Sequence, residues 1–387
     1  MNAIRRRLDE YHRGREPERL QLKYRRIAED PLSFFRGTPN LFFENWPADS
    51  ALLETPFVWL CGDLHLENFG AYRGDNRCTY FDFNDFDEAC LGPLAWDLAR
   101  LTVSAAIEAD ERGWSSADTE ALGARMIASY AAALGTGKAR WVERETAKGL
   151  MHELLETLHL RTWAAFLKSR TRVDVRRRRF LRVDNGKALP LQARREARVL
   201  ESFIADRKSG GLRYLDAARR IAGNSSLGVP RYVILAEDRQ ENLYLLDLKL
   251  ARPAVVPGIH HAAAQPAWPS EAHRVTAVQT MVQAIPPAFL EPVEFQKDWW
   301  VLRELMPGED RVEIAEASNR KFAEHAESLG EVVAWGHLRA GGRQGSATID
   351  ALTEFAARKD WRKDLLRFGL AAARQNRRDW QDFRKKS

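Results

Sequence analysis

The chain has 387 residues, of which 45% are hydrophobic and 29% are charged, and its formal net charge at pH 7 is +6. These values exclude a disordered or fibrous protein and fit a globular one that is long enough for two hydrophobic cores. No uncharged apolar run reaches the roughly 18 residues of a transmembrane helix, and the charged first residues lack the apolar segment of a signal peptide. We therefore expect a cytoplasmic protein with no membrane partner and with Cys61, Cys78 and Cys90 as reduced thiols.

Helices are predicted for the N-terminal region and for the middle of the chain. Residues 3–30 carry apolar residues at helical spacing, with interruptions at Gly14 and Pro17. Short strands are predicted at 57–61 and 79–83, because apolar and aromatic residues gather there around a turn that contains glycine. Further helices are predicted at residues 93–110, 116–134, 139–168 and 190–208.

The character of the sequence changes after Gly210-Gly211, where short β-like segments replace the helices. Strands are predicted at residues 213–221, 231–237, 243–250, 289–295 and 299–305. Helices are predicted at residues 270–284, 314–339 and 348–385. This pattern indicates a small mixed lobe of strands around one helix, followed by a helical C-terminal region.

The most informative residues lie in two short polar segments next to the predicted strands at 57–61 and 79–83. Asp63 and Asn68 stand five residues apart in the first segment, and Asp85 begins an acidic turn in the second. Phosphoryl transfer from a nucleotide needs one carboxylate at the acceptor hydroxyl, and an amide and a second carboxylate that hold magnesium against the phosphates. The spacing therefore predicts a catalytic site and not a generic acidic loop.

These two segments resemble parts of known kinases. Gly62-Asp63-Leu64-His65-Leu66-Glu67-Asn68 resembles the catalytic loop of aminoglycoside phosphotransferases and related small-molecule kinases, and the segment from Asp85 to Ala99 resembles their metal-binding turn and the helix after it. The whole chain resembles the DUF2252 family of uncharacterised bacterial proteins, which is grouped with the protein-kinase-like fold. The stretches that carry this second resemblance are Lys23-Tyr24-Arg25, Phe34-Phe35-Arg36-Gly37-Thr38, residues 61–100, the Gly-rich stretch near 223 and Lys249.

The resemblance implies a role for particular residues. Asp63 is expected to be the catalytic base, and Asn68, Asp85 and Asp87 are expected to bind Mg²⁺. Lys249 is expected to pair with phosphates of ATP, since a lysine inside an apolar strand requires an anionic partner. The other residues expected to contact the nucleotide or the acceptor are Gly223, Ser225, Ser226, Gly228 and Arg36.

Several of these assignments have a structural alternative. Asp63 is also a residue type that caps loops, and Lys249 could be an edge-strand lysine that faces water. The stretch 223–228 lacks the full Gly-x-Gly-x-x-Gly pattern and could be an ordinary hairpin turn. Arg36 suits phosphate oxygens, yet it could equally stack on the neighbouring Phe34 or Phe35 as a structural cation.

The two segments contain further acidic and histidine residues, which either compete for the metal-binding role or support the loop. Because side chains alternate along an extended chain, Asp82 and Asp85 should not point the same way unless the strand ends between them. His65 and Glu67 form a His-x-Glu pattern of the kind found in metal hydrolases, but we regard them as secondary to the kinase pattern. Asp97 is expected to brace the catalytic loop from the helix that follows.

The sequence departs from the kinase pattern at two points, which bear on whether the protein is active and not on its fold. Cys61 stands where the small-molecule kinases usually carry a histidine before Gly-Asp. The helix 270–284 should present a glutamate to Lys249, and family relatives tend to have one near the position of Ala277. Here only Glu271 is available on that helix, so either Glu271 substitutes, or another acid pairs with the lysine, or the nucleotide lobe is degraded.

We expect an α+β, protein-kinase-like fold of two lobes that is circularly permuted, because the β-rich lobe follows the catalytic loop along the chain and does not precede it. The expected domains are an N-terminal helical segment, 1–56, a catalytic helical lobe, 57–210, a β-rich nucleotide-binding lobe, 211–310, and C-terminal helices that pack back on the catalytic lobe, 311–387.

The expected function is ATP- and Mg²⁺-dependent phosphoryl transfer to a hydroxyl group of a small molecule. Nucleotidyl transfer (AMPylation) and non-catalytic nucleotide binding are alternatives, and a metal-dependent hydrolase is a more distant one. Residues 161–182 contain nine Arg or Lys residues and one Asp. This basic stretch would suit an anionic acceptor, or a nucleic acid if the protein is a nucleic-acid-binding one, although no nucleic-acid motif accompanies it.

Overall fold

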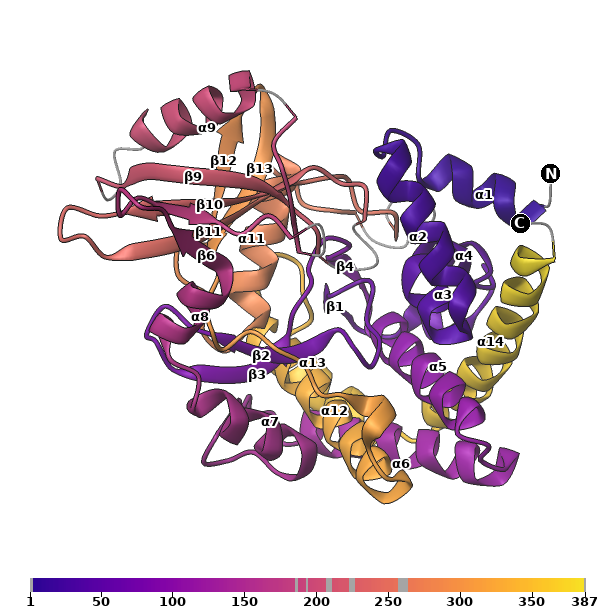
Figure 1. Cartoon of the computed structure of the whole chain (residues 1–387). Helices are drawn as coiled ribbons and strands as arrows, with labels where there is room; N and C mark the ends of the chain where they lie inside the picture. The colour runs from indigo at the N-terminus through magenta and orange to yellow at the C-terminus, as the bar shows by residue number, and fades with distance from the viewer. Residues whose placement is uncertain are drawn as a thin grey trace.

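A β-rich half and a helical half make up the molecule, which is an α+β protein (Figure 1). The computed structural model describes residues 3–184, 187–192, 194–206, 211–222, 227–256 and 264–385. Within these residues, no helix is long and apolar enough to cross a membrane.

The β-rich half is built on an antiparallel sheet with the strand order β12-β13-β11-β10-β9-β8. Its strands are β8 (Ala188–Leu189), β9 (Arg213–Arg220), β10 (Arg231–Glu237), β11 (Leu243–Leu250), β12 (Glu291–Phe295) and β13 (Asp298–Glu304). Strands β10 and β11 lie inside the sheet and are apolar over most of their length, as strands covered on both faces should be. The register places Lys249 between Arg231 on β10 and Val301 on β13.

Helices cover both faces of this sheet. Helix α9 (Arg194–Asp206) packs on one face, where Leu200 and Ile204 join the buried residues of β10 and β11. On the other face, α8 (Trp163–Arg170) and the hairpin of β6 (Thr171–Val173) and β7 (Arg179–Leu181) cover one end. Helix α11 (Glu271–Val282) packs against β12 and β13 at the other end. Lys249 lies on this second face, between the two coverings.

The helical half is formed by α5 (Ala95–Glu111), α6 (Ser116–Gly135), α12 (Asn319–Ala340) and α14 (Asp360–Arg384), with the shorter α7 (Gly149–His159), α13 (Ile349–Ala357) and η2 (Ile314–Glu316) around them. Their core contains large buried side chains such as Trp96, Tyr130 and Phe322. Helices α6 and α12 approach closely at Gly330, where a Cβ atom would lie 2.5 Å from the carbonyl oxygen of Met126.

The two ends of the chain meet on the outside of the helical half (Figure 1). The N-terminal helices are α1 (Ala3–Tyr11), α2 (Pro17–Glu29), α3 (Pro31–Gly37) and α4 (Pro39–Glu44). The last three begin with proline, which is favoured in the first turn of a helix because its missing N–H needs no partner there. Phe383 of α14 packs against the rings of Tyr24 and Phe34, and this contact joins the two ends.

Two small sheets bring the polar segments of the sequence together. After the turn η1 (Ala51–Glu54), β1 (Phe57–Leu60) pairs with β4 (Cys90–Pro93). Strand β2 (Phe69–Arg73) pairs with β3 (Thr79–Phe83), which also pairs with β5 (Val142–Glu143). The loop 61–68 joins β1 to β2 and the turn 84–89 joins β3 to β4, so strand pairing fixes the loop beside the turn. The amide of Asn84 accordingly donates to the carbonyl of Asn68 at 3.1 Å.

The predicted strands between 213 and 305 and the predicted helices at both ends of the chain match the structure closely. The prediction of a continuous helix over 139–168 is wrong, because this region contains β5, α7 and α8. The break between the two helices is local: the side chain of Thr162 caps the start of α8 by accepting from the amide of Ala165. The predicted helix at 190–208 is the shorter α9, and β8 just before it pairs with β9.

Candidate active site

The loop 61–68 is held in place by helix α5. The carboxylate of Asp97 accepts hydrogen bonds from the backbone amides of Cys61 at 2.8 Å and Gly62 at 3.0 Å. Gly62 has a φ of +81°, and a Cβ atom there would lie 2.0 Å from the carbonyl oxygen of Glu88. Only glycine fits this position, and the close approach presses the loop against the acidic turn 84–89. Asp97 is thus the brace that the sequence predicted.

Asp63 is buried at the head of this loop and forms an ion pair with Arg100 of α5, at 2.5 Å. Arg100 is itself fully buried, and its guanidinium lies 4.3 Å from the ring centre of Phe35 and 5.0 Å from that of Phe42. Such stacking fixes the guanidinium, and through it the carboxylate of Asp63. Sequence reasoning missed Arg100, although it stands one helical turn after Asp97 and so faces the same loop.

Asn68 closes the other end of the loop. Its side-chain amide donates to the carbonyl oxygen of Asp63 at 2.9 Å and to the sulfur of Cys61 at 3.3 Å. Within the described part of the chain, no donor is bonded to its Oδ1 atom, so this oxygen is available to a ligand. Asn68 therefore shapes the loop and keeps one side-chain oxygen available.

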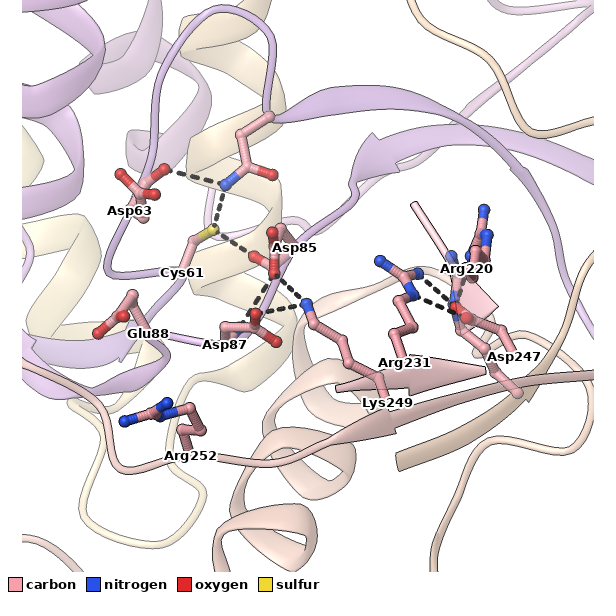
Figure 2. Close-up of polar contacts among 12 residues, drawn as sticks. Cys61, Asp63, Asp85, Asp87, Glu88, Arg220, Arg231, Asp247, Lys249 and Arg252 are labelled. Atoms are coloured by element: carbon pink, nitrogen blue, oxygen red, sulfur yellow. Dashed lines mark hydrogen bonds and ion pairs between the residues drawn. The ribbon is translucent and has the colours of Figure 1, made fainter. Parts of the chain in front are cut away.

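The acidic turn meets the large sheet at Lys249. Figure 2 shows Lys249 reaching from β11 toward Asp85 and Asp87, with Cys61 and Asp63 beyond them. The ammonium group forms an ion pair with Asp87 and lies 3.9 Å from Oδ1 of Asp85. Burial, and next the carboxylate of Asp87, raise the pKa of Asp85 above its usual range, and Lys249 opposes this rise. Two carboxylates thus share one cation.

The position of Lys249 shows whether it is an edge-strand lysine that faces water or a lysine with an anionic partner. Strand β11 lies inside the sheet, and the lysine side chain is only 14% exposed, so it is not an edge lysine that faces water. Its partner does not come from α11, because Glu271 of that helix pairs with Arg274 at 2.6 Å. Arg274 in turn donates to the carbonyl oxygen of Asp87 at 2.8 Å and steadies the acidic turn. Of the three options that the sequence left open, the structure shows the second: another acid, Asp87, pairs with Lys249.

Asp82 is not part of this group. Its Oδ2 atom accepts from the guanidinium of Arg339 at 2.6 Å and from the amide of Ala284 at 3.2 Å, and its Oδ1 atom accepts from the amide of Phe83 at 3.0 Å. The side chain is buried among these donors. Asp82 joins β3 to α12. Strand β3 ends at Phe83, between Asp82 and Asp85, so alternation along the strand does not fix the relative directions of these two side chains. Their different partners place them in separate contacts.

A cluster of arginines around one carboxylate lies next to Lys249 on the same face of the sheet, and sequence reasoning missed it. Asp247 is buried, two residues before Lys249, and pairs with Arg231 at 2.7 Å, with Arg220 at 2.7 Å and with Arg303 at 3.5 Å. Burial lowers the pKa of Arg220 to about 10 in spite of Asp247. The alternation of charge and apolar residues in the strand Leu-Tyr-Leu-Leu-Asp-Leu-Lys-Leu was the available signal.

Arg36 contacts the loop 61–68 through an acidic residue of that loop. It pairs with Glu67 at 2.7 Å, and Glu67 also pairs with Arg311 at 2.6 Å. His65 accepts the amide of Glu67 on Nδ1 at 3.2 Å, and burial, followed by the charge of Arg36, lowers its pKa well below the usual value. The arginine that stacks on Phe35 is Arg100 and not Arg36. His65, Glu67 and Arg36 therefore shape the loop.

The Gly-rich stretch is only partly visible. Gly223, Ser225 and Ser226 lie outside the described residues. Gly228 has a φ of +90°, and its carbonyl oxygen accepts from the amide of Glu16 at 3.2 Å. The end of this stretch is thus attached to the segment between α1 and α2.

The N-terminal helices bring further charge to the back of Asp63. Lys23 of α2 is completely buried; burial lowers its pKa well below the usual value, while Asp63 and Glu88 favour its charged form. Glu88 accepts from the hydroxyl of Tyr11 at 3.2 Å and from the amide of Val255 at 2.6 Å. Figure 2 shows Glu88 near the loop, on the side away from Lys249. Lys23 belongs to a stretch that carried the family resemblance, but no role could be assigned to it from the sequence.

The described residues contain no group of three or more His, Cys, Asp or Glu side chains that could hold a metal ion. The oxygen donors on hand are the carboxylates of Asp85 and Asp87 and the Oδ1 atom of Asn68. Hard divalent cations prefer such oxygens, and Mg²⁺ typically takes only one or two carboxylates from a protein because phosphates and water supply the rest. The donor set fits Mg²⁺ held together with a phosphate ligand.

Comparison with known proteins gives one match. The family described as "Uncharacterized protein conserved in bacteria (DUF2252)" matches residues 15–386, nearly the whole chain. No curated protein and no solved structure matches.

Proposed function

This chain belongs to the DUF2252 family of bacterial proteins, and we propose that it is an ATP- and Mg²⁺-dependent phosphotransferase that acts on a hydroxyl group of a small molecule. One observation carries the proposal: Lys249 of the large sheet meets Asp85 and Asp87 of the acidic turn, which is packed against the loop of Asp63 and Asn68. A cation for phosphates, oxygens for magnesium and a carboxylate for the acceptor lie at one junction.

The order of the elements supports a kinase-like arrangement. Strands β9, β10 and β11 are followed by α11 and then by β12 and β13, with Lys249 on the third strand. This is the order expected of a nucleotide lobe in the kinase fold, and it stands after the catalytic loop in the chain. The proposal therefore includes a circular permutation of that fold.

The electrostatics of the acidic turn support a magnesium site. Two neighbouring carboxylates repel each other, and the raised pKa of Asp85 reflects burial and this repulsion. Mg²⁺ held by Asp85, Asp87 and Asn68 would neutralise them and shield the charge that develops on the transferred phosphoryl group. Lys249 would then be released from Asp87 to contact the phosphates, as a lysine of a nucleotide site does.

The proposed reaction assigns a separate role to Asp63. The acceptor hydroxyl oxygen forms a bond to the γ-phosphorus of ATP while the bond from that phosphorus to the β–γ bridging oxygen breaks, and ADP leaves. The hydroxyl proton passes to the carboxylate of Asp63, which Arg100 holds in position. A small acceptor is proposed because α5 begins at Ala95, ten residues after Asp85, which leaves no room for a long activation segment.

Product analysis with wild type and Asp63→Asn tests the proposal. We expect Mg²⁺-dependent formation of ADP by the wild type in the presence of candidate hydroxyl acceptors, and a fall of about 100-fold or more in the variant, which still binds Mg-ATP. Asp364→Asn, an exposed position on α14, is the matched control. AMP and pyrophosphate as products would favour nucleotidyl transfer, and ATP binding without turnover that depends on Asp63 would favour a non-catalytic protein.

A further inference from the structure

A cavity of about 650 Å³ lies beside the cluster of Asp247. Its floor is the face of the large sheet that carries Lys249, where Val233 and Leu245 line it. Helix α8 forms one wall together with Leu181, Arg182, Asp184, Lys187 and Ala188. Residues 305–310, which follow β13, form the other wall. The basic stretch of the sequence, residues 161–182, is thus folded against the sheet and supplies part of this wall.

The lining of the cavity is rich in cations. It includes Arg161, Arg170, Arg182, Lys187 and Arg220, against the carboxylates of Asp184, Glu309 and Asp310. Three of these charges are already matched, because Arg161 pairs with Asp310 at 2.6 Å and Glu309 pairs with Arg303.

Three of the cations have no such match. Arg182 donates to carbonyl oxygens, among them that of Thr171 at 2.8 Å. Among the residues that the structure describes, no carboxylate forms an ion pair with Arg170, Arg182 or Lys187. The cavity therefore has an excess of positive charge that its own walls do not neutralise.

A row of charged side chains connects the cavity with the proposed catalytic site. Arg220 lines it and shares Asp247 with Arg231, and Arg231 stands opposite Lys249 in the register of β10 and β11. Figure 2 shows the sequence of side chains from Arg220 through Asp247 and Arg231 to Lys249 and the acidic turn. A chain of cations thus leads from the cavity to the proposed magnesium site.

We infer that this cavity binds phosphate groups of a polyphosphorylated ligand. Several arginine forks and a lysine around a confined space match the oxygens and the charge of linked phosphates better than those of a single carboxylate. A nucleic acid is less suited, because the run Arg176 to Arg178 at the hairpin tip lies outside the cavity. The inference rests on the proposed function only for the source of the phosphates: they belong either to the nucleotide or to a phosphorylated acceptor.

Binding of inorganic tripolyphosphate tests the inference without nucleotide or turnover. Calorimetry at physiological ionic strength and without Mg²⁺ compares the wild type with Arg170→Gln/Lys187→Gln. We expect binding by the wild type and a loss of about tenfold or more in affinity in the variant, since each charge-assisted contact is removed. The variant should fold, because neither side chain has an ion-pair partner in the described structure.

The matched control is Arg176→Gln/Arg177→Gln, which removes the same amount of positive charge at two positions outside the cavity. An affinity close to that of the wild type is expected for it. No binding of tripolyphosphate by the wild type, or an equal loss in the two double variants, would overturn the inference.

A competition experiment identifies the source of the phosphates. Binding of Mg-ATP is measured first, with Mg²⁺ in excess, and tripolyphosphate is then titrated into the ATP-saturated protein. Loss of tripolyphosphate binding assigns the cavity to phosphates of the nucleotide, and simultaneous binding assigns it to a phosphorylated acceptor. If the protein binds tripolyphosphate but not ATP, the inferred phosphate site in the cavity stands and the proposed function is contradicted. Failure of the inference and failure of the proposed function are therefore distinguishable.

Discussion

Asp63 and Asp85 lie in adjacent loops but in different electrostatic surroundings. Asp63 faces the fixed guanidinium of Arg100. Asp85 faces the carboxylate of Asp87 and shares Lys249 with it, and its pKa is raised by burial and then by that neighbour. The first environment holds the carboxylate in a fixed orientation. In the second environment two carboxylates lie together, and their repulsion costs free energy unless a cation neutralises it. We therefore assign the metal to the acidic turn.

The first prediction concerns stability. A carboxyl whose folded pKa is raised adds stability below its unfolded pKa, and this contribution is lost as the pH rises through the folded pKa. Asp85→Asn removes the cost of the charged form, so it should raise the free energy of unfolding at pH 8 without Mg²⁺. The gain should be at most about 1 kcal/mol, because the side chain is still 36% exposed and solvent screens its charge. Urea denaturation at several pH values measures it, and the difference from wild type should shrink as the pH falls. A difference that is constant with pH would contradict the assignment.

The second prediction concerns Lys249. Lys249→Met keeps the length of the side chain but removes the ion pair with Asp87. We expect the affinity for Mg-ATP to fall about tenfold or more, since a charge-assisted contact with the phosphates is lost. Lys363→Met, at an exposed position on α14, is the control and should bind as the wild type does. Equal affinities for Lys249→Met and wild type would exclude a role for this lysine in phosphate binding.

At the scale of elements, helix α5 organises the catalytic loop with two residues one turn apart. Asp97 accepts from two backbone amides of the loop, and Arg100 holds Asp63. A negative and a positive side chain on one helical face thus fix the backbone and the acid separately.

The third prediction follows from this arrangement. Asp97→Ala leaves the buried amides of Cys61 and Gly62 without an acceptor and should lower the free energy of unfolding by about 2–4 kcal/mol. Asp97→Asn retains one acceptor oxygen and should cost less. Chemical denaturation measures both, with the exposed Asp350→Ala on α13 as control. If Asp97→Ala is no less stable than Asp97→Asn, Asp97 is not the brace of the loop.

The sequence predicted the elements of the large sheet because their apolar residues recur in short runs that turns separate. It failed over 139–168, where Thr162 and the segment before α7 interrupt a pattern that is helical on average. The short strands β2 and β4 were also missed, since Phe69–Arg73 and Cys90–Pro93 are defined by pairing and not by their own pattern.

The site could be predicted where residues are close in the chain, as with Asp63, Asn68 and Asp85. Contacts across the fold could not be predicted. Arg100 and Asp247 acquire their roles only when α5 reaches the loop and when β9, β10 and β13 surround β11. The same holds for the acid that pairs with Lys249, which comes from the acidic turn and not from α11.

At the scale of the whole molecule, the proposed site lies where the two halves meet. The sheet provides Lys249, and the loops next to the helical half provide the acids. A ligand that binds there should therefore tie the halves together.

The fourth prediction is that Mg-ATP slows amide hydrogen exchange in both halves at once. Protection should increase about tenfold or more in β11 and in the loop 61–68, because opening of either element would have to release the ligand. Helix α14, remote from the site, serves as the internal control. Protection confined to one half would place the ligand elsewhere.

The most direct test of the account is calorimetric titration of ATP into the wild type and Asp85→Asn, with and without Mg²⁺. The account predicts that ATP binds tightly only when Mg²⁺ is present, and that this Mg²⁺-dependent gain in affinity disappears in the variant. Absence of ATP binding by the wild type, or binding that is the same without Mg²⁺ and in Asp85→Asn, would contradict it.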